Sequence, residues 1–391
     1  MKKLNFIIKY GLALLLLSFY SCESWLNVTP SDRLSEEMLF NDREGFVKAL
    51  NGVYIELNTN ELYGRNLTVG ALDVMGQYYS VASSSHAFYN YGGLVYTGND
   101  EKALFDNMWQ KCYAVIACCN TIIEKCDENK AGLSPVWRGS IKGEALALRA
   151  MLHFDMLRLF GPLTSELDKE SIPYQTNSDQ TVTPLLSGSE VVGLILDDLK
   201  NAVGLLKDTD PYFVEEEFSD TDLNYRRFRM NYFAAKGLMA RVQLWGGDKE
   251  KAAATAKEVI AEGQAEGAEF FPFVTNSEAT SSNPDRVFYS EVLFGTYHSS
   301  REKLHEDLFA PTLESTSILT LAGTARRDDL YDNENDYRYS VWSTYNKNGT
   351  SVLYHRKFEK QDNVTASRQY MIPLIRMSEM YLIAVECCKL D

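Results

Sequence analysis

Apolar residues recur at helical spacing along most of the chain, and the densest such stretch is residues 138–163, RGSIKGEALALRAMLHFDMLRLFGPL. Its apolar positions extend around nearly the whole helical circumference, which predicts a helix buried between neighbours. Gly143 and three nearby alanines leave part of its surface without large side chains, so another helix can approach closely. Gly161 and Pro162 predict where the helix ends. We expect the rest of the chain to pack around this central helix.

The same spacing predicts helices on both sides of the central one. A capping segment at residues 41–44 precedes an apolar face, and Ser187 to Glu190 forms a capping box for another helix. A link of only three residues, Gly246 to Asp248, forces the helices on either side of it into an antiparallel hairpin. The predicted helical segments are 45–57, 105–123, 187–206, 231–245, 249–262 and 372–386, the last with Pro373 in its first turn.

Two long segments lose this periodicity and are rich in aromatic and polar residues, 62–98 and 263–369. We expect loop-rich lobes there, with short strands at 287–294 and 351–358. Loops of this length are usually functional or disordered, and the many aromatic residues argue against disorder. Alternatively, each tyrosine packs its loop onto the helical body.

The central stretch GEALALRAMLHFDMLRLFGPL resembles the signature GEA..LRA..yF.L.rLFG..P of the SusD/RagB family, the nutrient-binding surface lipoproteins of Bacteroidetes. CESWLNVTPSD, NYFAAKGLMARVQLWGGDKEKAAATAKEVI and IPLIRMSEMYLIAVE resemble further family segments, in the family's order. The resemblance implies a mostly α fold, with tetratricopeptide-like helix pairs in a right-handed superhelical scaffold. It also implies loop-rich lobes with a few short strands.

The N-terminus has the pattern of an export signal, since a short basic start is followed by an apolar run that ends at Cys22. We expect residues 1–21 to be a lipoprotein signal peptide, Cys22 to be lipidated and 22–40 to form a tether. Simple cleavage is the alternative, because Phe19 and Tyr20 are bulky for a lipobox. The SusD-like domain would span 41–391, and the resemblance implies that it is shortened at its C-terminus. The lipid would lie in the outer membrane, with the protein facing outward.

Charge and aromatic content indicate the class of ligand. The 391 residues carry a formal net charge of -15, which argues against nucleic acid as a partner. Aromatic residues make up 12%, and exposed rings suit sugars because the C–H face of a pyranose stacks on a flat side chain. Our candidate ligand contacts are Tyr78, Tyr79, Tyr89, Tyr91, Tyr297, Trp342 and Tyr345.

Catalytic and metal-binding patterns are weak. There is no HExxH, GxSxG, Walker A or dinucleotide motif, and we expect His153 to be a satisfied core residue. Three cysteines spaced by seven predict small core side chains rather than a disulfide: Cys112, Cys119 and Cys126. An acidic cluster favours a solvated loop, with a calcium ion as the alternative: Asp328, Asp329, Asp332, Glu334 and Asp336.

These patterns together predict a surface lipoprotein that captures an oligosaccharide or polysaccharide without catalysis. The resemblance implies a partner, a SusC-like TonB-dependent transporter to which the glycan is delivered. Peptide uptake of the RagB type is the alternative, and a glycoside hydrolase is a third hypothesis. A hydrolase would need two carboxyl groups facing each other about 5 to 10 Å apart.

Overall fold

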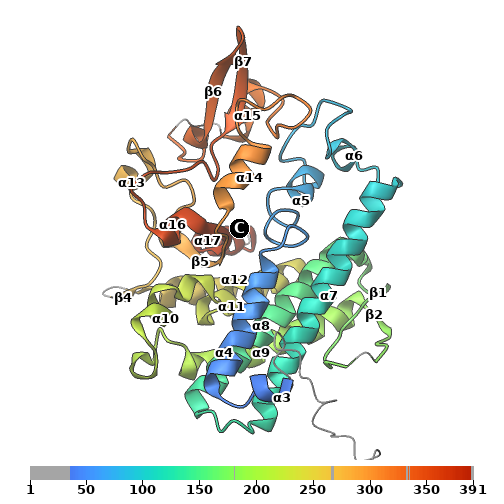
Figure 1. Ribbon diagram of the computed structural model, residues 1–391, viewed down its shortest axis with the longest axis vertical. Helices are drawn as coiled ribbons and strands as arrows, with labels where there is room; N and C mark the ends of the chain where they lie inside the picture. The colour runs from blue at the N-terminus through green and yellow to red at the C-terminus, as the bar shows by residue number, and fades with distance from the viewer. Residues whose placement is uncertain (1–35, 180, 266–267, 332, 334, 389–391) are drawn as a thin grey trace, which may run out of the picture.

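The computed structural model describes residues 36–388 except 180, 266–267, 332 and 334. It has two parts, a body of long helices and a loop-rich lobe that lies at one end of it (Figure 1). The helices of the body are α3 (Glu36–Leu39), α4 (Arg43–Leu57), α7 (Asn99–Glu128), α8 (Pro135–Phe160), α9 (Gly188–Thr209), α10 (Asp220–Asn224), α11 (Tyr232–Trp245), α12 (Lys249–Gly263) and α17 (Met377–Glu386).

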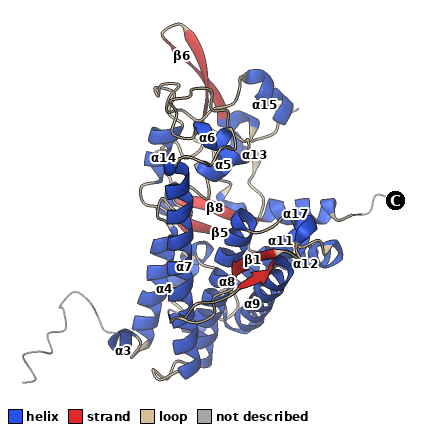
Figure 2. Ribbon diagram, turned by 90° about the vertical axis from the view of Figure 1, so that its right-hand side faces the viewer, coloured by secondary structure: helices blue, strands red, loops and turns tan. Residues whose placement is uncertain are grey.

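The lobe is built from short helices and from strands that pair only in twos. Its helices are α5 (Ala71–Met75), α6 (Tyr89–Gly92), α13 (Asn276–Thr280), α14 (Arg301–Leu308), α15 (Thr324–Leu330) and α16 (Ala366–Tyr370). The antiparallel pairs are β5 (Val292–Tyr297) with β8 (Met371–Arg376), and β6 (Trp342–Lys347) with β7 (Thr350–His355). The β6–β7 hairpin projects from the end of the lobe (Figure 2). Two small pairs lie outside the lobe: β1 (Glu170–Pro173) with β2 (Leu185–Ser187), and β3 (Gln264–Ala265) with β4 (Ala268–Glu269).

Helix α8 is the centre of the body, as its sequence predicts. It is buried along most of its length between α7 and α9, and it ends at Gly161. A Cβ atom at Gly143 would lie 2.7 Å from Cγ of Leu206 on α9. The close approach expected at the small residues of α8 is therefore confirmed, and it requires glycine at this position.

Other predicted helices are confirmed with small shifts at their ends. Asp42 caps α4 by accepting a hydrogen bond from the Gly45 amide at 2.9 Å, and the capping box of Ser187 and Glu190 opens α9. Helices α11 and α12 form the expected hairpin, with Gly247 at φ +89° in the link. The mostly helical fold with a few short strands is confirmed.

The two loop-rich segments share one hydrophobic core rather than forming separate lobes. Tyr79 from the first segment packs near Phe309 and Trp342 from the second, with ring centroids 5.4 and 6.4 Å apart. A single bridge between Ser80 and Thr320 also links them. Burial of these aromatic side chains supplies the hydrophobic stabilisation that holds an otherwise irregular region in one conformation.

The prediction of one helix over 372–386 is wrong for its first part. Residues Met371–Arg376 form β8, and α17 begins only at Met377. Apolar side chains at Ile372 and Ile375 are buried in the strand, so a short apolar run was mistaken for a helical turn. Pro373, which has no amide hydrogen, lies opposite Gly295 where the register of the pair shifts, a position at which a strand tolerates proline.

Candidate functional site

The foundation of the candidate site is a buried charge network around Glu144 of α8. Its carboxylate pairs with Arg226 and, at 3.2 Å, with Arg229, and it accepts a hydrogen bond from the Tyr54 hydroxyl at 2.7 Å. Arg226 also donates to both carboxylate oxygens of Asp210, at 3.0 and 2.6 Å. Burial alone would raise the pKa of Glu144, but the guanidinium groups of Arg229 and Arg226 lower it below its usual value. The network joins α8 to α4 and to the segment after α10.

A second buried pair fixes the other side of α8. Arg149 forms a bidentate pair with Asp198 of α9, both N–O distances being 2.7 Å, and donates to Asn120 of α7 at 2.8 Å. His153 accepts a hydrogen bond from the Gln175 amide at its Nε2, and its Nδ1 lies 3.0 Å from the Arg149 carbonyl. Burial lowers the pKa of His153 to about 3, so it is the satisfied, neutral core residue that was predicted.

Above the Glu144 network, four aromatic side chains form a surface that we call the aromatic shelf: Tyr225, Phe228, Tyr297 and Tyr370. Neighbouring ring centroids are 5.3 to 6.2 Å apart. Tyr225 and Tyr297 are 38% and 36% exposed, whereas Phe228 is buried beneath them. Tyr297 ends β5, while Phe228 lies in the short η3 helix (Arg226–Phe228) that the Arg226 ion pairs hold in place.

A cavity of about 500 Å³ lies beside the shelf, between it and helix α4. Asn51, Asn58 and Arg229 supply polar groups around it. Arg229 donates to Asn51, pairs with Glu144, and lies over the Tyr54 ring at 4.4 Å from the centroid. The polar rim is therefore held in position before any ligand arrives. Rings flanked by fixed amide and guanidinium groups match the two surfaces of a sugar, its C–H face and its hydroxyls.

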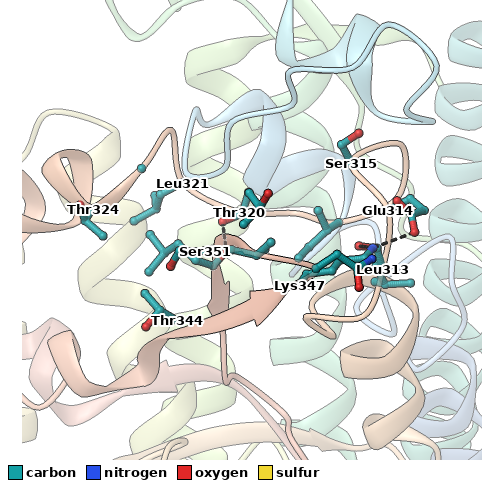
Figure 3. Close-up of a pocket in the computed structure, with 15 residues that line it drawn as sticks. Leu313, Glu314, Ser315, Thr320, Leu321, Thr324, Thr344, Lys347 and Ser351 are labelled. Atoms are coloured by element: carbon teal, nitrogen blue, oxygen red, sulfur yellow. Dashed lines mark hydrogen bonds and ion pairs between the residues drawn. The ribbon is translucent and has the colours of Figure 1, made fainter.

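A larger cavity, about 790 Å³, is a groove between residues 313–324 and the β6–β7 hairpin (Figure 3). Hydroxyl side chains line much of it, among them Thr320, Thr344 and Ser351. Lys347 crosses its edge and is held by Glu314 at 2.7 Å and by the Leu313 carbonyl at 2.9 Å. Such a groove can hydrogen-bond a polyol, but no aromatic ring is among its described lining residues. It therefore lacks the stacking surface that the shelf provides.

Three of the predicted contact residues lie in the core of the lobe. Tyr79, Tyr91 and Trp342 are each 3% exposed. Trp342 packs edge-on against His355 with ring centroids 4.3 Å apart. Because buried rings present no face to solvent, we remove these three residues from the candidate set. The alternative interpretation, that such aromatics pack the loops, describes them correctly.

The other four predicted residues are accessible but do not form one surface. Tyr78 is half-buried, and its hydroxyl lies 2.9 Å from that of Tyr331. Tyr89 and Tyr345 are each 43% exposed, on α6 and on the β6–β7 hairpin. Only Tyr297 belongs to the aromatic shelf. Sequence reasoning missed its partners Tyr225, Phe228 and Tyr370, although the mixture of aromatic and arginine residues in NYRRFRMN was a usable signal.

Two members of the acidic cluster, Asp328 and Asp336, have basic or hydroxyl partners. Asp328 accepts from Arg327 and from the Tyr339 hydroxyl, and Asp336 is paired with Arg338 at 2.6 Å. Asp332 and Glu334 lie outside the described residues. Within the residues that the structure describes, no three histidine, cysteine or acidic side chains are grouped as a metal ion requires. We therefore propose no calcium site.

The remaining candidate chemistry concerns the cysteines and the membrane. Cys112, Cys119 and Cys126 are buried and free, as predicted, and burial raises the pKa of Cys126 to about 12. Cys22 lies outside the described residues, so its lipidation stays a prediction. Among the helices described, none combines the length and the apolar character needed to cross a membrane.

Comparisons with known proteins agree with the fold. A family model described as "SusD-like_3: Starch-binding associating with outer membrane" matches residues 24–244. SusD-like protein P2 of Formosa agariphila is 25% identical over 265 residues, which cover 66% of this chain and 46% of that protein. A SusD-like protein of Bacteroides ovatus is 30% identical over 146 residues, 36% of this chain and 23% of that protein. The chain thus spans less than half the length of these relatives.

Solved structures show the same architecture. A SusD superfamily protein from Bacteroides thetaiotaomicron matches with a TM-score of 0.68 and 21% identity, covering 88% of this chain and 76% of that one. A laminarin-binding SusD-like protein matches with a TM-score of 0.63 and 15% identity, covering 89% and 80%. At such identities the likeness establishes a common fold.

Proposed function

Because the chain belongs to the SusD-like family, whose model matches residues 24–244, we propose that it captures a saccharide on the bacterial surface and binds it at the aromatic shelf. The observation that carries this proposal is the shelf itself, where Tyr225 and Tyr297 expose their rings beside a cavity with fixed amide and guanidinium groups. The family description as starch-binding and the likeness to a laminarin-binding protein support a saccharide ligand.

Binding at the shelf would combine stacking with hydrogen bonding. A pyranose ring would lie against Tyr297, and its hydroxyls would reach Asn51, Asn58 and Arg229. Since the Glu144 network already holds Arg229, little ordering entropy would be lost on binding. One face of the sugar would stay in solvent, which suits a polysaccharide that continues beyond the site.

Capture without catalysis is the second part of the proposal. Among the described residues that line the shelf cavity there is no aspartate or glutamate, so a pair of glycosidase carboxylates is missing from this surface. Glu144, which contacts the lining residues Arg229 and Tyr54, is buried and paired with two arginines and a tyrosine. This arrangement favours a binding protein over the glycoside hydrolase.

The cellular setting is also proposed. A lipid on Cys22 would hold the protein at the outer membrane, where it would pass its ligand to a SusC-like TonB-dependent transporter. The family description as associating with the outer membrane supports this location. A peptide ligand of the RagB type is the competing proposal, and the experiment below separates the two.

The test is retention of the chain from Glu23 onward in affinity gels that contain neutral or acidic polysaccharides, with peptide binding and sugar release measured in parallel. Tyr297→Ala should lose most of the retention given by the matching polysaccharide, because it removes the stacked ring. Tyr89→Ala is the matched control, since it deletes a tyrosine of similar exposure that does not belong to the aromatic shelf. If peptides bind and no polysaccharide does, peptide uptake replaces the proposal; release of sugar would establish an enzyme.

A further inference from the structure

A third cavity, of about 370 Å³, lies where β8 runs into α17, and three basic side chains line it: Arg286, Lys357 and Arg376. We call this cavity the cationic pocket. Arg376 is the last residue of β8, Lys357 follows β7, and Arg286 lies in the loop before β5. Three segments distant in sequence therefore bring positive charge to one place, in a chain whose net charge is -15.

Two carboxylates at the cationic pocket, Glu379 and Glu359, are already paired with arginine side chains. Glu379, which lines it, is held at both oxygens by Arg241 with N–O distances of 2.6 Å. Glu359 accepts from Arg286 at 3.2 Å and also from Arg356 at 2.8 Å. Through the part of the chain that the structure describes, neither Lys357 nor Arg376 has a carboxylate within 4.0 Å.

The groups that Lys357 and Arg376 do contact are aromatic. The ammonium of Lys357 lies 5.4 Å from the Phe358 ring centroid, and the Arg376 guanidinium lies 5.7 Å from that of Phe288. The Arg286 side chain is only 7% exposed, and its Nε has no hydrogen-bond partner. Burial lowers the pKa of Lys357 and of Arg376. The carboxylates of Asp73 and Glu291 partly offset this for Lys357 and Arg376 respectively, whereas the charge of Arg376 lowers the pKa of Lys357 further. An anion in the pocket would relieve this repulsion.

The start of helix α17 gives an independent indication of an anion site. Arg376 occupies the N-cap position but makes no side-chain capping hydrogen bond, and Ser378 in the first turn lines the pocket. Free amide groups and the positive end of the helix dipole favour a negatively charged group at this position. The uncapped helix and the unpaired cations thus meet at the same cavity.

An aromatic cavity of about 570 Å³ adjoins the cationic pocket, and the two share Arg376 and Ser378. Phe273 and Tyr381 stand at its wall with ring centroids 5.3 Å apart, and they are 46% and 38% exposed. A ligand with a flat apolar face could lie against these rings while a charged substituent reaches Arg376. The combination matches a sugar ring that carries an oxyanion.

We propose that the cationic pocket binds the oxyanion of an acidic saccharide, a carboxylate or a sulfate ester, while the adjoining aromatic cavity holds its sugar ring. The saccharide part of this proposal rests on the proposed function, whereas the oxyanion part stands by itself. A single buried oxyanion is compatible with the acidic surface because salt screens distant charges over about 8 Å. An extended polyanion such as nucleic acid would still meet the whole acidic surface.

The test measures binding by calorimetry to the chain from Glu23 onward, at constant ionic strength, with four probes: sodium sulfate, sodium acetate, D-glucuronate and neutral D-glucose. Lys357→Met and Arg376→Gln remove one cation each from the pocket. Lys257→Met is the control, because it makes the same charge change at an exposed lysine on α12. Thermal unfolding without ligand is recorded for each variant, since removal of an uncompensated buried cation should not lower the unfolding temperature.

We expect glucuronate to bind at least about tenfold more tightly than glucose, and either pocket variant to remove that preference while Lys257→Met keeps it. Equal, weak binding of glucuronate and glucose by the unaltered chain, with no binding of sulfate or acetate, would overturn the proposal. Acetate or sulfate bound as tightly as glucuronate would leave an oxyanion site and overturn its saccharide part. Retention by a neutral polysaccharide at the aromatic shelf reports separately on the proposed function.

Discussion

The buried carboxylate of Glu144 should contribute far more to stability than an exposed one. The Glu144 side chain is 4% exposed and pairs with Arg226, which is 2% exposed. It also pairs with Arg229 and accepts a hydrogen bond from the Tyr54 hydroxyl. Glu144→Gln removes the charge while nearly preserving the shape, so Arg226 keeps only Asp210 as a counterion. Breaking a buried pair in this way typically destabilises a protein by about 3–5 kcal/mol. Because Asp210 still neutralises Arg226, we expect a loss in the free energy of unfolding at the lower end of this range, about 3 kcal/mol.

The matched control is Glu44→Gln on α4, which breaks an exposed i,i+4 pair with Lys48. Such pairs contribute about 0.3–0.5 kcal/mol, so this variant should be nearly neutral. Urea unfolding at pH 7, monitored by tryptophan fluorescence, measures the loss in the free energy of unfolding for Glu144→Gln and for Glu44→Gln. If Glu144→Gln is no more destabilising than Glu44→Gln, the network does not hold the helices together as we describe.

The pH dependence of this difference has a definite sign. Because the pKa of Glu144 is lower in the folded state than in the unfolded chain, its stabilisation is fully present above the unfolded value of about 4.3. It is lost as the pH falls through the folded-state pKa. The gap between the unaltered chain and Glu144→Gln should therefore be constant from pH 8 to 6 and shrink below about pH 4. A gap that widens in acid would contradict the assignment.

Three further predictions concern the helical body. Gly143→Ala should destabilise the chain by about 1–2 kcal/mol, because its Cβ would lie 2.7 Å from a leucine of α9. Gly204→Ala has open space around its Cβ and should stabilise the chain by about 0.5–1 kcal/mol, and urea unfolding measures both changes. A maleimide should label exposed Cys118 in the native chain and buried Cys119 only in urea, as mass spectrometry of peptides would show. Ser187→Ala should lower the free energy of unfolding by about 1 kcal/mol through loss of the α9 cap, and no loss would refute the cap's role.

Periodicity and end signals were sufficient for the helical body. The apolar positions of α8 and its Gly161-Pro162 end predicted a buried central helix, and the Ser187 box predicted the start of α9. The sequence offered no comparable signal for partners distant along the chain. Glu144 and Arg149 lie in a stretch dominated by apolar residues, and their counterions come from α9 and from residues 210–229.

The lobe and the site were less predictable for a related reason. Tyr79 and Tyr345 have the same side chain and similar polar neighbourhoods in the sequence, yet one is 3% and the other 43% exposed. Tertiary packing, which the local sequence does not encode visibly, decides between them. At Pro373 the local signal was ambiguous, because a proline is compatible both with the first turn of a helix and with an irregular strand, and the helix was predicted wrongly.

The most direct test of the account is calorimetric titration of the chain from Glu23 onward with an oligosaccharide from the polysaccharide that retains it. We predict that Tyr225→Ala and Tyr297→Ala each weaken binding about tenfold or more, because each removes an exposed ring of the aromatic shelf. Tyr345→Ala, on the β6–β7 hairpin, should bind as the unaltered chain does. Full affinity in both shelf variants, with loss only in Tyr345→Ala, would place the ligand elsewhere and contradict the central claim.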